Sequence, residues 1–255
     1  MKLQKLEHPK LDKKEYEKEL EKLQLQLMTL QHDLYNQNMR CVVVVEGIDA
    51  AGKGGMIRRM TEFMDPRGVR VHPIGAPSID ELEEHYMQRF WRLLPKRGEV
   101  SIFDRSWYGR VLVERVDNLT PHKRWQRAYK EISQFEKLLI NDGVIVIKLF
   151  LSISKDEQLK RFKERIENPK KRWKITSEDI LNRQNWDSYQ QAFEDMLDKT
   201  DGKKNPWHIV AANNKRYARI NAMKHFAKRL NAHIDTEQVE LLKPEVEKLA
   251  TKYLP

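Results

Sequence analysis

The chain has 255 residues, of which 40% are hydrophobic and 34% are charged, with only 10 glycines and 10 prolines. This composition is that of a globular protein with a polar surface, and it excludes a disordered or collagen-like chain. The longest apolar run covers residues 41–45, far fewer than the roughly 20 that span a bilayer, and the first ten residues contain no signal-peptide core. We therefore expect a soluble, cytoplasmic protein without a membrane partner. Its single cysteine, Cys41, excludes an internal disulfide framework.

Lysine and arginine, 48 in number, exceed the 38 acidic residues and give a net charge of +10. Such an excess predicts a polyanionic partner, which nucleic acid, an acidic membrane or a phosphate-rich small substrate would satisfy. The excess is local: residues 158–174 contain eight basic and two acidic side chains, and residues 215–229 contain six basic and no acidic ones. The remainder of the chain is slightly acidic, so the positive charge is concentrated in two segments.

Leucines spaced alternately three and four residues apart predict an amphipathic helix over residues 16–36, docked on the chain's own core or on a sister subunit, or used to recruit a partner. Five short β-branched runs follow, each separated from the next by a long helical stretch. This alternation predicts an α/β fold, a doubly wound and mostly parallel five-stranded sheet with helices on both faces. The predicted strands cover residues 42–45, 69–74, 100–103, 144–150 and 209–212.

A phosphate-binding loop is predicted between the first strand and the next helix. Gly47, Gly52 and Lys53 have the spacing Gly-x4-Gly-Lys, in which glycines allow backbone N–H groups to converge on phosphate oxygens and the lysine reaches a phosphoryl group. An ordinary glycine-rich turn would leave Lys53 unexplained. The loop residues expected to bind phosphate are Gly47, Ala50, Ala51, Gly52, Lys53 and Gly54.

A metal site is predicted because the loop departs from the usual pattern. The Ser or Thr that normally follows the lysine and binds Mg²⁺ is Gly54 here, so another ligand must hold the metal. Asp49 is the candidate, because a hard cation prefers carboxylate oxygen. Asp104 ends a buried strand in the manner of a Walker B element and would share one or two Mg²⁺ ions with Asp49, with Mn²⁺ as a substitute. Its alternative role is a strand-end cap paired with Arg105.

Arginines that follow this strand extend the candidate site, because their planar guanidinium groups match phosphate geometry. Arg105 and Arg110 are the expected phosphate ligands. Glu114 and Arg115 either extend the site or form an intrahelical ion pair.

The first basic segment predicts a helical lid over residues 158–185 that closes positive side chains over phosphate and excludes water. Capping boxes predict helix starts at Ser78 with Glu81 and at Ser154 with Glu157, the second just before this lid. A solvated basic face is the alternative to a lid. The expected phosphate ligands of the lid are Arg161, Arg165, Lys170, Lys171 and Arg172. We thus expect one domain over 1–255, divided into an N-terminal helical segment (1–39), a core (40–157), the lid (158–185) and a C-terminal core segment (186–255).

Five motifs, in order along the chain, together resemble the polyphosphate kinase type 2 family. They are EGIDAAGKGG (46–55), DPRG (65–68), FDRSWYGRVLVERV (103–116), EQLKRFKERIENPKKRWK (157–174) and NPWHIVAANNKRYARI (205–220). The resemblance implies a cytoplasmic, P-loop-containing, Mg²⁺-dependent enzyme that transfers phosphoryl groups between inorganic polyphosphate and nucleotides. It also implies that Asp49 and Asp104 bind the metal, that Lys53 is the loop lysine, and that Arg105 and Arg165 bind polyphosphate.

Gly109 and the Val-Leu-Val-Glu-Arg-Val sequence at 111–116 resemble the class that phosphorylates AMP to ADP. Members of that class are often two fused copies, whereas this chain has one; we expect a homo-oligomer, a dimer or a tetramer. The hypothesis is direct, reversible in-line transfer from polyphosphate to AMP, and to ADP giving ATP, with Asp49, Lys53, Asp104 and Arg105 as catalytic residues. No general base is needed, because a nucleotide phosphate is already anionic.

Three alternatives remain open at this stage. The chain could belong to another class of the same family and phosphorylate ADP or GDP, or it could be an ATP-dependent nucleoside-monophosphate kinase. The latter would not need so extended a basic surface. A nucleic-acid-binding protein would explain the net charge, but the sequence contains no recognised binding motif, so we expect no nucleic-acid partner.

Overall fold

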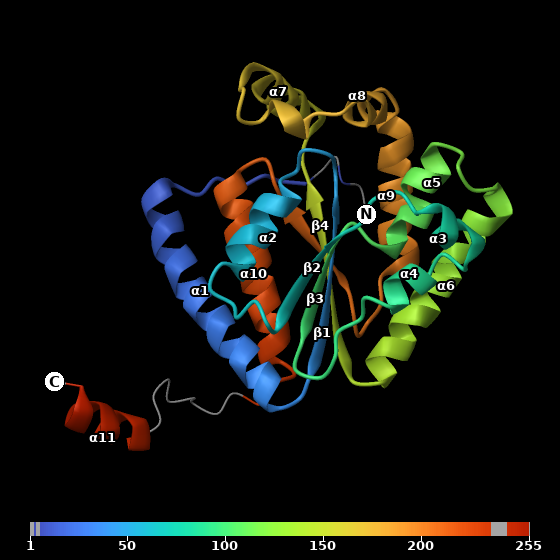
Figure 1. Ribbon diagram of the computed structural model, residues 1–255. Coiled ribbons are helices and arrows are strands. Elements are labelled where there is room, and N and C mark those ends of the chain that lie inside the picture. Colours follow the sequence, from blue (N-terminus) through green and yellow to red (C-terminus); the bar gives the residue numbers. More distant parts are fainter. Residues whose placement is uncertain (1–2, 4–5, 236–243, 255) are drawn as a thin grey trace.

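Five parallel strands form a single sheet in the order β2-β3-β1-β4-β5 (Figure 1). The computed structural model describes residues 3, 6–235 and 244–254. Each strand lies where a β-branched run predicts one, so the predicted five-stranded α/β fold is confirmed. The strands are β1 (Arg40–Gly47), β2 (Val69–Pro73), β3 (Val100–Asp104), β4 (Val144–Ser152) and β5 (Trp207–Ala211).

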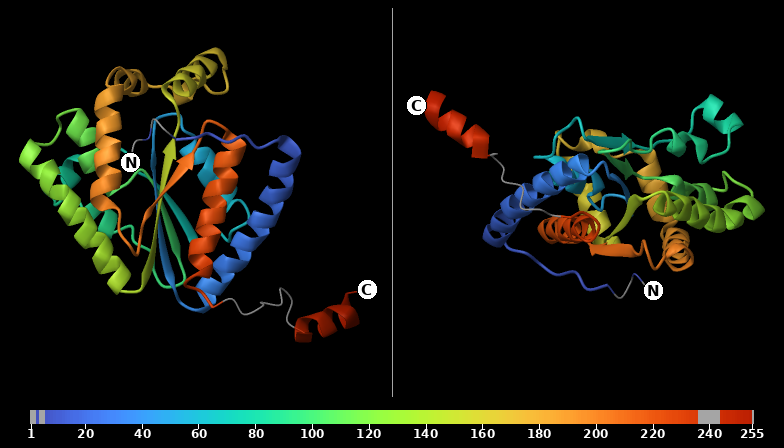
Figure 2. Two further views of the ribbon diagram at one scale, coloured as in Figure 1. Left: turned by 180° about the vertical axis from the view of Figure 1, so that it is seen from behind. Right: turned by 90° about the horizontal axis from the view of Figure 1, so that it is seen from below.

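Helices cover both faces of this sheet (Figures 1 and 2). One face carries α1 (Lys13–Asn36), α2 (Lys53–Thr61) and α10 (Lys215–Asn231). The other face carries α6 (His122–Asn141) and α9 (Trp186–Thr200), with several short elements beside them. The short elements are α3 (Ile79–Glu83), α4 (Gln88–Trp91), the 3-10 helix η2 (Trp107–Val111) and α5 (Val113–Val116).

The predicted lid region consists of α7 (Lys155–Glu167), the 3-10 helix η3 (Arg172–Lys174) and α8 (Ser177–Gln184). These elements lie above the carboxyl ends of the strands, at the top of Figure 1. A last helix, α11 (Pro244–Tyr253), lies apart from the sheet. Parts of the predicted end segments, 1–39 and 186–255, fall outside the described residues. Among the helices that the structure describes, none combines the length and the apolarity needed to cross a membrane.

The first helix packs on the chain's own core, as one of the sequence-based interpretations predicts. It begins after Asp12, whose carboxylate accepts a hydrogen bond from the backbone N–H of Glu15 at 3.0 Å. Its leucines face α10, and burial of this apolar stripe stabilises the pair of helices. The fully or nearly fully buried leucines are Leu23, Leu27, Leu30 and Leu34.

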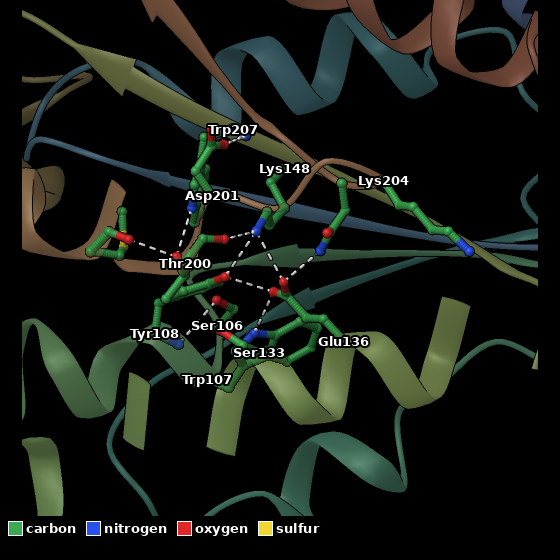
Figure 3. A network of polar contacts seen from close by, with 12 residues as sticks. Ser106, Trp107, Tyr108, Ser133, Glu136, Lys148, Thr200, Asp201, Lys204 and Trp207 are labelled. Atoms are coloured by element: carbon green, nitrogen blue, oxygen red, sulfur yellow. Dashed lines mark hydrogen bonds and ion pairs between the residues drawn. The ribbon is translucent and has the colours of Figure 1, made fainter. Parts of the chain in front are cut away.

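A buried polar network joins the sheet to the helices on the second face (Figure 3). The Lys148 Nζ on β4 lies 3.0 Å from Oε2 of Glu136 on α6 and donates to the Thr200 carbonyl at 2.7 Å. A buried charge is costly unless it is paired and hydrogen-bonded, and both conditions are met here. Glu136 also accepts hydrogen bonds from Trp107 Nε1, Tyr108 OH and Asn205 Nδ2. The network thereby fixes η2, which directly follows the end of β3.

Candidate active site

The phosphate loop connects β1 to α2 at the carboxyl edge of the sheet, where open α/β folds bind their ligands. Gly47 must be glycine: its φ is +152°, and a Cβ atom there would lie 2.4 Å from the carbonyl oxygen of Leu151 on β4. Gly52 caps α2 with a φ of +104°. The first N–H groups of α2 have no partner within the helix, and free N–H groups at the start of a helix suit an anion. Lys53 Nζ donates to the Gly47 carbonyl at 2.8 Å, so its ammonium lies at this loop.

Two aspartates and one arginine meet at the loop. The β1–β3 register places Asp104 beside Val45, two residues before Gly47. Arg105 Nη2 lies 3.4 Å from Asp49 Oδ1. Partial desolvation acts to lower the pKa of Arg105, but the nearby carboxylates, Asp49 first, outweigh it and raise the pKa above its usual value. The first turn of α2 also lies close to Asp104, because a Cβ on Gly54 would be 3.8 Å from its Oδ2.

The donor set fits a magnesium ion. Among the residues that the structure describes, no three His, Cys, Asp or Glu side chains converge into a protein cage for a metal. Mg²⁺ is commonly held by one or two carboxylates, with water and substrate phosphates as the remaining ligands. Asp49 and Asp104 supply carboxylates beside the phosphate loop, so the chemistry of the site suits that mode of binding.

A pocket of about 360 Å³ lies between the phosphate loop, the lid and α10. The loop contributes Ala50, Ala51 and Gly52 to its lining, and both basic segments of the sequence contribute charged side chains. This surplus of positive charge suits a polyanionic ligand. The basic side chains in its lining are Arg161, Arg165, Lys171, Lys174, Lys215 and Arg219, against one acid, Glu164.

The lid residues differ in how far they are free to reach a ligand. Arg161 is 3% exposed, and its guanidinium donates to backbone carbonyls. Arg165 lies one turn later, donates to the Lys174 carbonyl at 3.1 Å and is 3.5 Å from Asp179. Lys171 also lines the pocket. Lys170, shortly before η3, and Arg172, its first residue, are exposed.

The family model described as polyphosphate kinase 2 (PPK2) matches residues 10–238. The chain belongs to the polyphosphate kinase 2 family. The family and the fold that the sequence predicts are therefore confirmed.

Relatives whose names specify different phosphate acceptors resemble this family member. Over 214 residues it is 48% identical to polyphosphate:AMP phosphotransferase of Pseudomonas aeruginosa, covering 84% of this chain and 43% of the relative. Over 233 residues it is 40% identical to ADP-polyphosphate phosphotransferase 3 of Rhizobium meliloti, covering 91% of this chain and 81% of the relative. A solved polyphosphate kinase 2 structure from Pseudomonas aeruginosa PA01 is 45% identical with a TM-score of 0.88, covering 91% of this chain and 51% of that one. The chain thus spans less than half the length of the curated polyphosphate:AMP phosphotransferase.

Three predicted site residues of this polyphosphate kinase 2 family member form ion pairs that involve no residue of the phosphate loop. Arg110 Nη1 on η2 is 2.6 Å from Oε2 of Glu114 on α5, so this ion pair joins two helical elements and is not an intrahelical pair of Glu114 with Arg115. Arg115 Nη1 is instead 2.7 Å from Oδ2 of Asp195 on α9. Residues Arg110, Glu114 and Arg115 are not part of the pocket lining at the loop.

Glu46, directly before the first loop glycine, is a site residue to which sequence reasoning assigned no role. It is buried, and its Oε1 accepts a hydrogen bond from Ser106 Oγ at 2.8 Å. Burial raises the pKa of Glu46, against the opposing effects of that hydrogen bond, Lys53 and Arg105. An acid at the end of an otherwise apolar strand was the available signal.

Asn182 of α8 is a second such residue. Its Nδ2 donates to Asp49 Oδ2 at 2.8 Å, and its own Oδ1 accepts from Tyr189 OH at 3.0 Å. The lid therefore touches the candidate metal ligand directly. No local pattern marks Asn182, because the contact joins residues 133 positions apart.

Proposed function

We propose that this protein transfers the terminal phosphoryl group of inorganic polyphosphate to a nucleotide, chiefly AMP to ADP and also ADP to ATP, reversibly. The observation that carries the proposal is the pocket that the phosphate loop shares with basic side chains of α7, η3 and α10. Positive charge on several sides of one cavity suits a linear polyanion better than a single phosphate group. The activities in the names of the relatives support the same reaction.

Catalysis in this proposal rests on positioning and charge neutralisation, which dominate phosphoryl transfer. The loop N–H groups and Lys53 hold the reacting phosphates, and Arg105 neutralises charge that builds up in the transition state. Asp49 and Asp104 would hold Mg²⁺, or Mn²⁺ in its place, which supplies further neutralisation of phosphate charge when bound. A nucleotide phosphate is already anionic, so no residue is needed to remove a proton.

The preference for AMP rests on Gly109 of η2. Its backbone does not require glycine, because a Cβ atom there would meet Val113 Cγ1 at 3.8 Å, an ordinary contact. The identity of residue 109 is therefore free to serve substrate selection. We further propose a single phosphotransferase domain that works in the cytoplasm as a homo-oligomer, with no nucleic-acid partner.

The test incubates the purified protein with Mg²⁺, long-chain polyphosphate and, in separate reactions, AMP, ADP, GMP or GDP. Chromatographic separation of nucleotides should show ADP from AMP as the fastest product. Product from ADP or GDP alone would move the protein to another acceptor class. Parallel reactions with ATP as the donor separate the alternative kinase, which would use ATP and ignore polyphosphate. Absence of product from every acceptor with polyphosphate would refute the proposal.

A further inference from the structure

The Arg161 guanidinium has five N–H groups, and the protein supplies an oxygen acceptor for each of them. Nε donates to Glu157 Oε1 at 2.7 Å. Nη1 donates to the carbonyls of Ala50 and Ala51, both at 2.9 Å. Nη2 donates to the carbonyls of Ala212 at 2.7 Å and Asn213 at 2.8 Å. A phosphate oxygen could bind this guanidinium only by displacing one of these acceptors.

The same face of α7 holds a third loop carbonyl. Gln158 Nε2, three residues before Arg161, donates to the Asp49 carbonyl at 3.3 Å, and Gln158 is itself held by Arg183 Nη1 at 3.1 Å. Side chains of α7 therefore bind the carbonyl oxygens of three consecutive loop residues, 49 to 51. In a planar trans peptide the N–H points opposite to the C=O. Fixing these carbonyls consequently fixes the directions of the loop N–H groups.

The second half of the guanidinium holds the connection from β5 to α10. Ala212 and Asn213 lie in this connection, and the Asn213 side chain binds the start of α7 through the Ser154 N–H at 2.9 Å. The α10 helix then places Lys215 and Arg219 in the pocket lining. One buried side chain thus joins the lid helix, the phosphate loop and the start of α10, which are three separate walls of the pocket.

We propose that Arg161 is a positioning residue, which holds the phosphate loop and the start of α10 in the arrangement that binds phosphate and does not itself bind phosphate. This role replaces the sequence-based expectation that Arg161 is a phosphate ligand. The positioning role of Arg161 rests on the proposed function only because one of the two experiments below measures turnover. Arg165, on the same helix and lining the same pocket, is 20% exposed, and its guanidinium donates to a single backbone carbonyl. It provides the matched control.

The first experiment compares Arg161→Lys with Arg165→Lys in the full chain. Lysine keeps the charge but has three donors on one atom and does not reach two carbonyl pairs at once. Since misplacement by about 1 Å costs roughly 100-fold in rate, Arg161→Lys should lower kcat by about that factor. Arg165→Lys should keep most of kcat and raise the KM for polyphosphate. A near-normal kcat in Arg161→Lys, with a raised KM for polyphosphate, would overturn the proposal and make Arg161 a direct ligand.

The second experiment needs no turnover. Hydrogen exchange of the peptide covering residues 46–56 should become faster in Arg161→Lys and stay unchanged in Arg165→Lys. Inorganic tripolyphosphate should slow this exchange in wild type and in Arg165→Lys, and less in Arg161→Lys. Unchanged exchange in Arg161→Lys would overturn the inference even if the wild type is active. If the wild type transfers no phosphoryl group, the proposed function fails, and the exchange result still decides the role of Arg161.

A milder variant keeps the test decisive if Arg161→Lys does not fold, which thermal unfolding monitored by circular dichroism will show. Gln158→Leu removes the contact with the Asp49 carbonyl and preserves side-chain volume. It should also speed exchange in residues 46–56 and lower kcat, by a smaller factor than Arg161→Lys. Wild-type exchange and kcat in Gln158→Leu would contradict the idea that α7 positions the loop through its carbonyls.

Discussion

Lys148 and Lys215 show two ways in which this protein accommodates a lysine whose pKa is lowered by desolvation. Lys148 is fully buried in β4, and burial lowers its pKa although the Glu136 carboxylate 3.0 Å away opposes this shift. Lys215 lies at the start of α10, where the positive charge of Arg161 adds to partial desolvation and lowers its pKa further. The charge of Lys148 is balanced by the Glu136 carboxylate. Lys215 instead lies among pocket residues with more positive than negative charges.

The two lysines differ in whether a group of this chain balances their charge. Every partner of Lys148 is a group of this chain, and the network links β4, α6, η2 and the end of α9 (Figure 3). Within the residues that the structure describes, neither Lys171 nor Lys215 forms an ion pair, although both line the pocket. A bound polyanion would supply the missing negative charge. Under the proposed function, the same residue type would therefore serve stability in one region and binding in the other.

The largest expected effect lies at the pocket carboxylates. Asp49→Asn and Asp104→Asn should each lower kcat by roughly 1000-fold, because each removes a charge that, in the proposed function, would hold the cation that neutralises phosphate charge. Both changes are isosteric and lie at a solvent-accessible site, so the free energy of unfolding should change by less than about 1 kcal/mol. Initial rates over a Mg²⁺ titration, together with urea denaturation, measure the two quantities.

Asp187→Asn, on the exposed side of α9, is the control for loss of one negative charge and should keep wild-type kcat. If Asp49→Asn kept full activity, Asp49 would not replace the Ser or Thr ligand that the loop lacks. If Asp187→Asn lost activity to the same degree, net charge rather than the site would explain the effect.

The next largest effect is expected at the two lysines, where the same change to methionine should affect stability in one region and substrate binding in the other. Lys148→Met leaves Glu136 charged and unpaired in the interior, and it should lower the free energy of unfolding by about 3–5 kcal/mol. Lys215→Met, at an exposed position, should change that free energy by less than about 0.5 kcal/mol and raise the KM for polyphosphate. Urea denaturation and initial rates on both variants check this. Equal destabilisation in both variants, or an unchanged KM for polyphosphate in Lys215→Met, would contradict the distinction between a stabilising and a binding lysine.

The parts of the structure that could be predicted are those that local sequence determines. The β-branched runs locate the strands, and the spacing of Gly47, Gly52 and Lys53 locates the loop, because strand burial and tight turns depend on neighbouring residues. Asp104 could be placed because the carboxyl ends of parallel strands meet at one edge.

The roles of the charged side chains could not be predicted, because they depend on contacts between distant residues. Arg161 and Arg165 lie one helical turn apart on α7 and carry the same charge. Of the two, Arg161 is the one that donates to loop carbonyls, more than 100 positions away in the sequence. The capping box expected at Ser154 forms only its first half: Ser154 accepts from the Glu157 N–H, but the Glu157 carboxylate binds Arg161 instead. Lys148, within the otherwise apolar sequence of β4, was the one local indication that an acidic partner such as Glu136 lies in the interior.

A third arrangement of basic groups gives the smallest expected effect and extends the comparison to pH. His208 on β5 and His225 on α10 stack with ring centroids 3.9 Å apart and an interplanar angle of 11°. Desolvation, followed by the charges of His208, Arg229 and Lys228, lowers the pKa of His225 to about 4. No acid of the described part of the chain forms an ion pair with His225, so this group is accommodated by staying neutral, unlike Lys148.

The sign of the pH effect follows from proton binding. Because the folded-state pKa of His225 lies below its ordinary value of 6.5, the unfolded chain binds more protons between pH 4 and 6.5. Stability contributed by neutral His225 should therefore be present above pH 6.5 and be lost as pH falls toward 4. The difference in unfolding free energy between pH 7 and pH 5, measured by urea denaturation, should shrink in His225→Gln and stay at the wild-type value in His32→Gln, on the exposed side of α1. An equal difference in wild type and His225→Gln would show that the stacked pair does not titrate in this range, and the acid sensitivity would then belong to the paired carboxylates instead.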